Sequence, residues 1–150
     1  MSVLKIGYTG TQRGMTALQC RAVWEIVNLE TFIAHHGDCV GGDAQFDVIV
    51  RRATGCQGVV IHPCDLDAKR AYCEIRQGVD ILREVKTPLD RNRDIVAEID
   101  LLIAGPGEMI PKQRSGTWTT VRYAQEARRR LMIVFPNGAV VRDSWIDDPA

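Results

Sequence analysis

The sequence predicts a single three-layer α/β domain built on a mainly parallel sheet. Five short apolar segments alternate with amphipathic stretches of helical length, and glycine-rich segments follow several of the apolar ones. Parallel strands need long crossover connections, usually helices, so this alternation favours a parallel sheet with helices on both faces. A length of 150 residues is usual for one domain, and we expect residues 1–150 to form it.

The first half of the chain holds three predicted strands and two predicted helices. Short apolar runs that end in turn-forming residues predict strands at residues 3–8, 31–35 and 58–63. Thr16 is a favourable N-cap residue, and the apolar side chains after it recur at near-helical spacing. The second helix is predicted over residues 44–53, and Gly55 supplies its stop.

The second half continues the same alternation. Strands are expected at residues 100–104, 131–135 and, at a sheet edge, 139–141. Asp90 is the predicted cap of one helix, and Ser115 opens another that ends at the three arginines 128–130, whose charge suits a helix C-terminus. Residues 65–88 have weak periodicity and are compatible with a short helix or an irregular flap. The tail, residues 147–150, is expected to be solvated.

Composition argues against several classes of partner. Lys plus Arg and Asp plus Glu both total 19, so the formal net charge is zero and no global field attracts nucleic acid or an anionic membrane. No apolar stretch approaches the roughly 18 residues of a membrane span. The five cysteines form no CxxC pair and cannot all pair within one chain, which predicts reduced thiols and a cytoplasmic location.

Three glycine-rich segments are the candidate ligand loops: residues 7–14, 37–42 and 105–116. Each follows a predicted strand, and ligands of open parallel sheets bind outside the carboxyl ends of the strands. Gly116 and Thr117 open a helix, where free N–H groups and the helix dipole favour a phosphate. Neither GxGxxG nor GxxxxGK[ST] occurs, so a conventional dehydrogenase or P-loop enzyme is disfavoured.

Four segments together resemble one family of domains. They are Gly7-Tyr8-Thr9-Gly10-Thr11, Gly41-Gly42-Asp43, Arg91-Asn92-Arg93-Asp94 ahead of Asp100-Leu101-Leu102-Ile103-Ala104, and Ser115-Gly116-Thr117-Trp118. In order and spacing, over residues 3–135, they resemble the SLOG superfamily. That superfamily includes lonely-guy phosphoribohydrolases, DNA-processing protein A, molybdenum-cofactor carrier-like proteins and nucleotide-sensing domains.

The resemblance implies a Rossmann-like domain that binds a nucleotide or phosphoribosyl-type ligand in a sensing, sequestration or carrier role. Gly116 and Thr117 match the family's phosphate loop, and Asn92 and Arg93 would face the same pocket. Together with the glycine loops, this predicts as ligand-binding residues Gly10, Thr11, Arg13, Gly41, Gly42, Asp43, Asn92, Arg93, Gly105, Gly107, Ser115, Gly116 and Thr117. The family also implies a homo-oligomer, and we expect no required cofactor.

The chain departs from the lonely-guy pattern PGGxGTxxE at its catalytic residue. Thr120 stands where the glutamate belongs, and an insertion separates Gly107 from Gly116. Whether the chain is an enzyme is therefore open. The alternative function is a nucleoside 5'-monophosphate phosphoribohydrolase-like N-glycosidase, in which Asp43 or Glu108 would supply the carboxylate that stabilises an oxocarbenium-like state. A nucleic-acid-handling role is disfavoured by the neutral charge.

The histidines and cysteines do not predict a metal site. No pair among His35, His36 and His62 has helical i, i+3 or i, i+4 spacing, and no CxxC anchors a cluster. Cys64 is expected to be an ordinary thiol. The sequence therefore predicts no bound metal.

Overall fold

The computed structural model describes residues 3–142 and confirms the α/β class. Its elements, in chain order, are β1 (Leu4–Gly10), α1 (Ala17–Val27), β2 (Phe32–His36), α2 (Gly42–Arg52), β3 (Cys56–Ile61), a short 3-10 helix (Asp67–Lys69), β4 (Ile81–Leu82), α3 (Pro88–Glu98), β5 (Leu101–Gly105), α4 (Gly116–Glu126), β6 (Arg130–Val134) and β7 (Val140–Arg142). Within residues 3–142, no helix is both long and apolar enough to cross a bilayer.

The strands form one sheet in the order β4-β3-β2-β1-β5-β6-β7. All neighbouring pairs are parallel except β6 with β7, which is antiparallel. From the central strand β1 the chain first builds outward through β2 to β4, and then crosses to the other side to build β5 to β7. The strand order therefore reverses between β1 and β5, and a crevice is expected at such a point.

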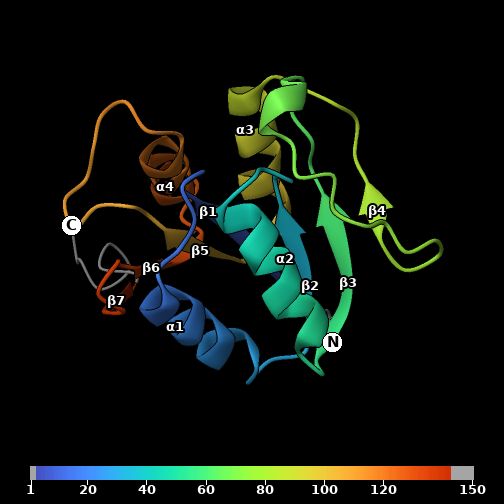
Figure 1. Cartoon of the computed structure of the whole chain (residues 1–150), viewed down its shortest axis with the longest axis horizontal. Coiled ribbons are helices and arrows are strands. Elements are labelled where there is room, and N and C mark those ends of the chain that lie inside the picture. The colour runs from blue at the N-terminus through green and yellow to red at the C-terminus, as the bar shows by residue number, and fades with distance from the viewer. Residues whose placement is uncertain (1–2, 143–150) are drawn as a thin grey trace.

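Two helices cover each face of the sheet (Figure 1). Helices α1 and α2 pack over one apolar core, which includes Val23, Phe46 and Ile103. Helices α3 and α4 pack over the other, which includes Ile95 and Val121. Side chains of β5 alternate between the two cores because successive residues of a strand point to opposite faces. This is the predicted three-layer arrangement.

The N-cap residues of α1, α3 and α4 can be compared with those predicted from the sequence. The Thr16 side chain accepts a hydrogen bond from the Gln19 N–H in a complete capping box, and Ser115 caps α4, so both of these predictions are confirmed. The prediction for Asp90 is wrong. Thr87 caps α3, and Pro88 occupies the first turn, where its missing N–H costs no hydrogen bond.

Several predicted boundaries are corrected by the structure. Helix α2 begins at Gly42, two residues before the predicted start, and α4 ends at Glu126. The arginines 128–130 follow α4, and Arg130 already belongs to β6. Strand β4 lies inside residues 65–88, where no strand was predicted, and it is only two residues long. The predicted tail at 147–150 lies outside the described residues.

Candidate functional site

A pocket of about 370 Å³ opens at the carboxyl ends of the strands, beside the point where the strand order reverses. The loops after β1, β2 and β5 meet there. Thr11 joins them, because its N–H donates to the Gly105 carbonyl (3.4 Å) and its carbonyl accepts from the Gly42 N–H (2.9 Å). The three glycine-rich segments therefore converge on one edge, as predicted from the sequence.

Tyr8, near the end of β1, lines this pocket, and its side chain packs into the core that α1 and α2 cover. The residue is 1 % exposed, and its ring stacks on Phe46 at 4.8 Å between centroids. Glycines surround the hydroxyl: a β-carbon at Gly42 or Gly105 would lie 2.6 or 2.5 Å from the Tyr8 oxygen. Burial, with Asp43 nearby, raises the pKa of Tyr8 well above its ordinary value, so the hydroxyl stays protonated. Among the described residues it has no hydrogen-bond partner.

Asp43, in the first turn of α2, supplies a buried carboxyl group to the pocket wall. It accepts a hydrogen bond from the Cys39 N–H at 3.1 Å. Burial raises the pKa of Asp43, although His36 and Arg91 oppose the rise. The carboxylate is therefore held in an environment that disfavours its charge.

Arg91 and Asn92 enter the pocket from the first turns of α3. The Arg91 guanidinium is buried and donates to the carbonyls of Gly37 (2.5 Å) and His62 (3.1 Å), and to Asn92 Oδ1 (2.7 Å). These contacts fix both side chains before any ligand arrives. The guanidinium places a positive charge close to Asp43.

The N-terminus of α4 forms the opposite wall. Ser115 Oγ accepts from the Trp118 N–H, and a β-carbon added to Gly116 would meet no heavy atom within 4 Å, so the backbone is approachable there. Ser115, Gly116 and Thr117 all line the pocket. Lys69, Lys112 and Arg114 also line it and add positive charge.

The two carboxylates proposed for catalysis differ in how far they are paired. Glu108 lines the pocket but accepts from Trp118 Nε1 (3.0 Å) and forms ion pairs with Arg13 (3.1 Å) and Lys112 (3.4 Å). Thr120 is fully buried, and its hydroxyl donates to the Gly116 carbonyl within α4. Position 120 therefore contributes no side-chain group to the pocket lining.

Most of the predicted ligand-binding residues gather at this pocket. Those that line it are Gly10, Thr11, Asp43, Asn92, Gly107, Ser115, Gly116 and Thr117. Gly41 caps α2, Gly42 is its first residue and Gly105 ends β5, all behind the lining residues. Arg13 reaches the rim through Glu108. Gly41 has a φ of 87° and packs against the Gln12 backbone, so its role is to let two loops approach closely.

Arg93 does not lie where the resemblance placed it. Its guanidinium stacks on the Tyr123 ring at 4.0 Å, on α4, and Arg93 borders a separate shallow pocket. Neighbouring residues of a helix point about 100° apart, and the rotation of α3 turns Arg91 and Asn92 toward the main pocket and Arg93 toward α4. Arg91, Tyr8 and Lys69 line the main pocket but were not among the predicted site residues. The position of Tyr8, two residues before Gly10 at a strand end, was the available signal.

Comparison with known proteins shows the fold. No family model matches the sequence, and no curated protein matches it significantly. A molybdenum cofactor binding protein from the phototrophic bacterium Rippkaea orientalis superimposes with a TM-score of 0.64 at 19% identity, over 90% of this chain and 78% of that one. The structural-genomics target TM1055 gives 0.58 at 14% identity, over 85% and 72%. The chain therefore shares the Rossmann-like α/β fold of these two proteins.

Proposed function

We propose that the pocket binds a small molecule that combines a phosphate with a nitrogen heterocycle, in a sensing, sequestration or carrier role. A nucleotide or phosphoribosyl compound has this chemistry, and so does a phosphorylated pterin such as the molybdenum cofactor named for one structural neighbour. The observation that carries the proposal is the pocket lining, in which buried Asp43 and Asn92 lie across from the open start of α4. Beside it lies the Tyr8 hydroxyl, which has no hydrogen-bond partner among the described residues. A buried hydroxyl without a partner costs about 1–3 kcal/mol. A ligand acceptor would recover this cost once the glycine segments around the hydroxyl shift to admit it.

The phosphate would bind at the start of α4. There the N–H groups of Gly116 and Thr117 have no partners within the helix, and the helix dipole favours an anion. Lys112 and Arg114 line the same wall and add charge. The heterocycle would then reach inward, where Tyr8 offers a donor and Asn92 an amide.

The pairing of Glu108 and Thr120 with other protein groups favours ligand binding without catalysis. Glu108 is held by three donors, and Thr120 bonds within its own helix. One observation favours the N-glycosidase alternative. Asp43 places a buried carboxyl group in the pocket lining, and burial raises its pKa, as suits a general acid. Release of free base from a nucleoside monophosphate, abolished in Asp43→Asn, would establish that alternative. Its absence in the presence of tight binding would support a carrier or sensor.

The direct test is thermal unfolding with a panel of nucleoside monophosphates, nucleoside diphosphate-riboses, cyclic nucleotides and molybdenum cofactor. A ligand at about 100 times its Kd adds roughly 2.7 kcal/mol of stability. Tyr8→Phe is expected to weaken binding about tenfold while leaving the free protein as stable as before or more stable, since it removes an unsatisfied group. Tyr72→Phe is the matched control, because that hydroxyl bonds Asp67 at the surface.

Thr117→Val and Arg114→Ala probe the phosphate wall in the same assay. Both should reduce the shift for phosphorylated ligands and leave unphosphorylated bases unaffected. A panel without any stabilising ligand would contradict the proposed function, as would full binding by Tyr8→Phe together with Thr117→Val.

A further inference from the structure

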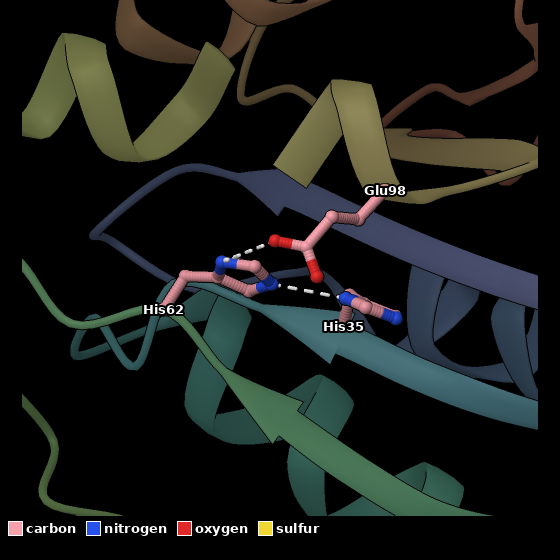
Figure 2. Close-up of side chains that lie close together, drawn as sticks. All are labelled: His35, His62 and Glu98. Atoms are coloured by element: carbon pink, nitrogen blue, oxygen red, sulfur yellow. Dashed lines mark hydrogen bonds and ion pairs between the residues drawn. The ribbon is translucent and has the colours of Figure 1, made fainter. Parts of the chain in front are cut away.

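A second cluster of side chains lies on the α3 face of the sheet, away from the α4 wall of the pocket. His35 comes from β2, His62 follows β3 directly, and Glu98 ends α3. Figure 2 shows the two imidazoles facing each other with the Glu98 carboxylate beside them. His35 Nδ1 and His62 Nε2 are 2.9 Å apart, and Glu98 Oε2 lies 3.9 Å from His62 Nδ1. The two histidine residues are 3 % and 2 % exposed.

The donor atoms suit a first-row divalent metal. One ligand atom from each residue lies within 4.8 Å of the other two. Zinc bonds imidazole nitrogen at about 2.0–2.1 Å, so two nitrogens of a tetrahedral site stand about 3.3 Å apart. The two nitrogens that now face each other at 2.9 Å would need to separate by only a few tenths of an ångström. Two imidazoles and one carboxylate form a set that zinc, cobalt and nickel accept.

Arg83 holds the Glu98 carboxylate in place, and the partial exposure of Glu98 gives an ion access to the cluster. Arg83 donates to Glu98 Oε1 from Nη2 at 2.6 Å and from Nε at 3.2 Å, and Oε2 lies nearest His62 Nδ1, the ring nitrogen that does not face His35. An ion between His35 Nδ1 and His62 Nε2 therefore needs the Glu98 carboxylate to turn toward that pair of nitrogens. The Glu98 side chain is 31 % exposed, so the cluster reaches the surface along this residue. Ligating carboxylates are commonly held by such an outer contact. The Arg83 charge also opposes a cation, which limits the affinity.

We propose that His35, His62 and Glu98 bind one divalent transition-metal ion of the zinc class, with three protein ligands and a fourth position left to water or a small ligand. The site is separate from the phosphate wall and does not depend on the function proposed for the pocket. Among the described residues one other group of possible ligands has comparable spacing, His36, Asp47 and Cys73. That group contains a thiol, which makes the two sites distinguishable by spectroscopy.

The test uses the untagged chain, stripped with a chelator and titrated with Zn²⁺ by calorimetry and with Co²⁺ by absorption. One ion per chain is expected, with the visible bands of tetrahedral Co²⁺ and no thiolate-to-metal band in the near ultraviolet. His62→Gln should abolish binding, and Glu98→Gln should weaken it at least about tenfold. Cys73→Ala is the control, because it alters the other group and should leave binding unchanged.

Arg83→Gln gives a result that a purely structural role for the cluster would not produce. It removes a competing charge from the carboxylate and should tighten Zn²⁺ binding by up to about fivefold. Circular dichroism of each metal-free variant confirms that it folds, and the partly exposed Glu98→Gln serves if His62→Gln does not. No binding above background, a thiolate band lost in Cys73→Ala, or undiminished binding by Glu98→Gln would each overturn the proposal.

Discussion

His35 and His36 are neighbours on β2, yet their side chains are bonded very differently. Successive strand residues point to opposite faces, so His36 faces α2 while His35 faces α3. His36 Nδ1 accepts from the Asp38 N–H (2.9 Å), and its Nε2 therefore donates to Asp47 (2.8 Å). Among residues 3–142, His35 has one hydrogen bond to another side chain, that of His62, and either ring can be its donor. The first histidine environment is saturated and structural, whereas the second leaves nitrogen atoms available for a ligand.

Replacing each histidine by leucine should separate the two environments most clearly. His36→Leu removes one partner of the buried Asp47 carboxylate and leaves the Asp38 N–H without its acceptor. The free energy of unfolding should therefore fall by about 4 kcal/mol. His35→Leu breaks one neutral hydrogen bond and keeps the volume, with a loss of about 1 kcal/mol. Urea unfolding measures both. Equal losses would show that the two environments are energetically alike.

The pH dependence of the free energy of unfolding between pH 6.5 and 4 should come from His35 and His62. Burial, with His62 nearby, lowers the pKa of His35 to about 4, and burial, with Arg83 nearby, lowers that of His62 to about 4, from an ordinary 6.5. Between pH 6.5 and 4 the unfolded chain takes up protons that the folded chain does not. Stability is therefore full above pH 6.5 and should fall by about 3 kcal/mol for each of the two histidines as the pH drops to 4.

This fall is measured by urea unfolding in chelator at successive pH values. The loss should be smaller in His35→Leu over the same pH range. An unchanged slope in that variant would assign the effect to other groups.

Two buried aspartates on the His36 side should respond in opposite directions. Burial raises the pKa of Asp43, whereas at Asp47 hydrogen bonds from His36 and Arg51 outweigh burial and lower the pKa. Asp43→Asn should therefore raise the free energy of unfolding at pH 7 by about 1 kcal/mol, and Asp47→Asn should lower it by a similar amount. Thermal unfolding of both variants in one buffer decides this, and changes of the same sign would refute it.

The smallest effect is expected at the pocket rim. Arg13 pairs with Glu108, but its side chain is 72 % exposed, and exposed ion pairs contribute less than about 1 kcal/mol. Arg13→Ala should change the free energy of unfolding by under about 0.5 kcal/mol, with no dependence on salt beyond that of the unmodified chain. A larger loss in urea unfolding would mean that the 106–114 loop is held in place by this contact.

The sequence predicted the fold well because its signals were local and repeated. Apolar runs alternating with amphipathic segments specified the parallel sheet, and Thr16 and Ser115 were identified as caps by side-chain chemistry. Strand β4 was missed because two exposed residues, Ile81 and Leu82, carry no alternating pattern. It exists through pairing with β3, which is a tertiary contact.

The sequence predicted where the candidate site lies, but not every side chain that lines it. Strand ends and glycines indicated where loops would meet, and the Thr11 contacts show that they do. Which residues of α3 face the pocket depends on the rotation of this helix about its axis. Arg93 was therefore predicted as a ligand-binding residue, whereas the structure places Arg91 in the pocket lining. The His35 and His62 pairing joins residues from two strands, and spacing along the chain could not reveal it.

The central place of β1 has a consequence for the order in which the chain can fold. One neighbour of β1, the strand β2, ends at His36, but the other, β5, begins only at Leu101. During synthesis, β1 to β3 with α1 and α2 can assemble and bury much of one core while the opposite face of the half-sheet is still bare. Pairing across such a sequence separation is slow. The nascent chain should therefore be most prone to aggregation after β3 has emerged and before α3 to β6 have followed.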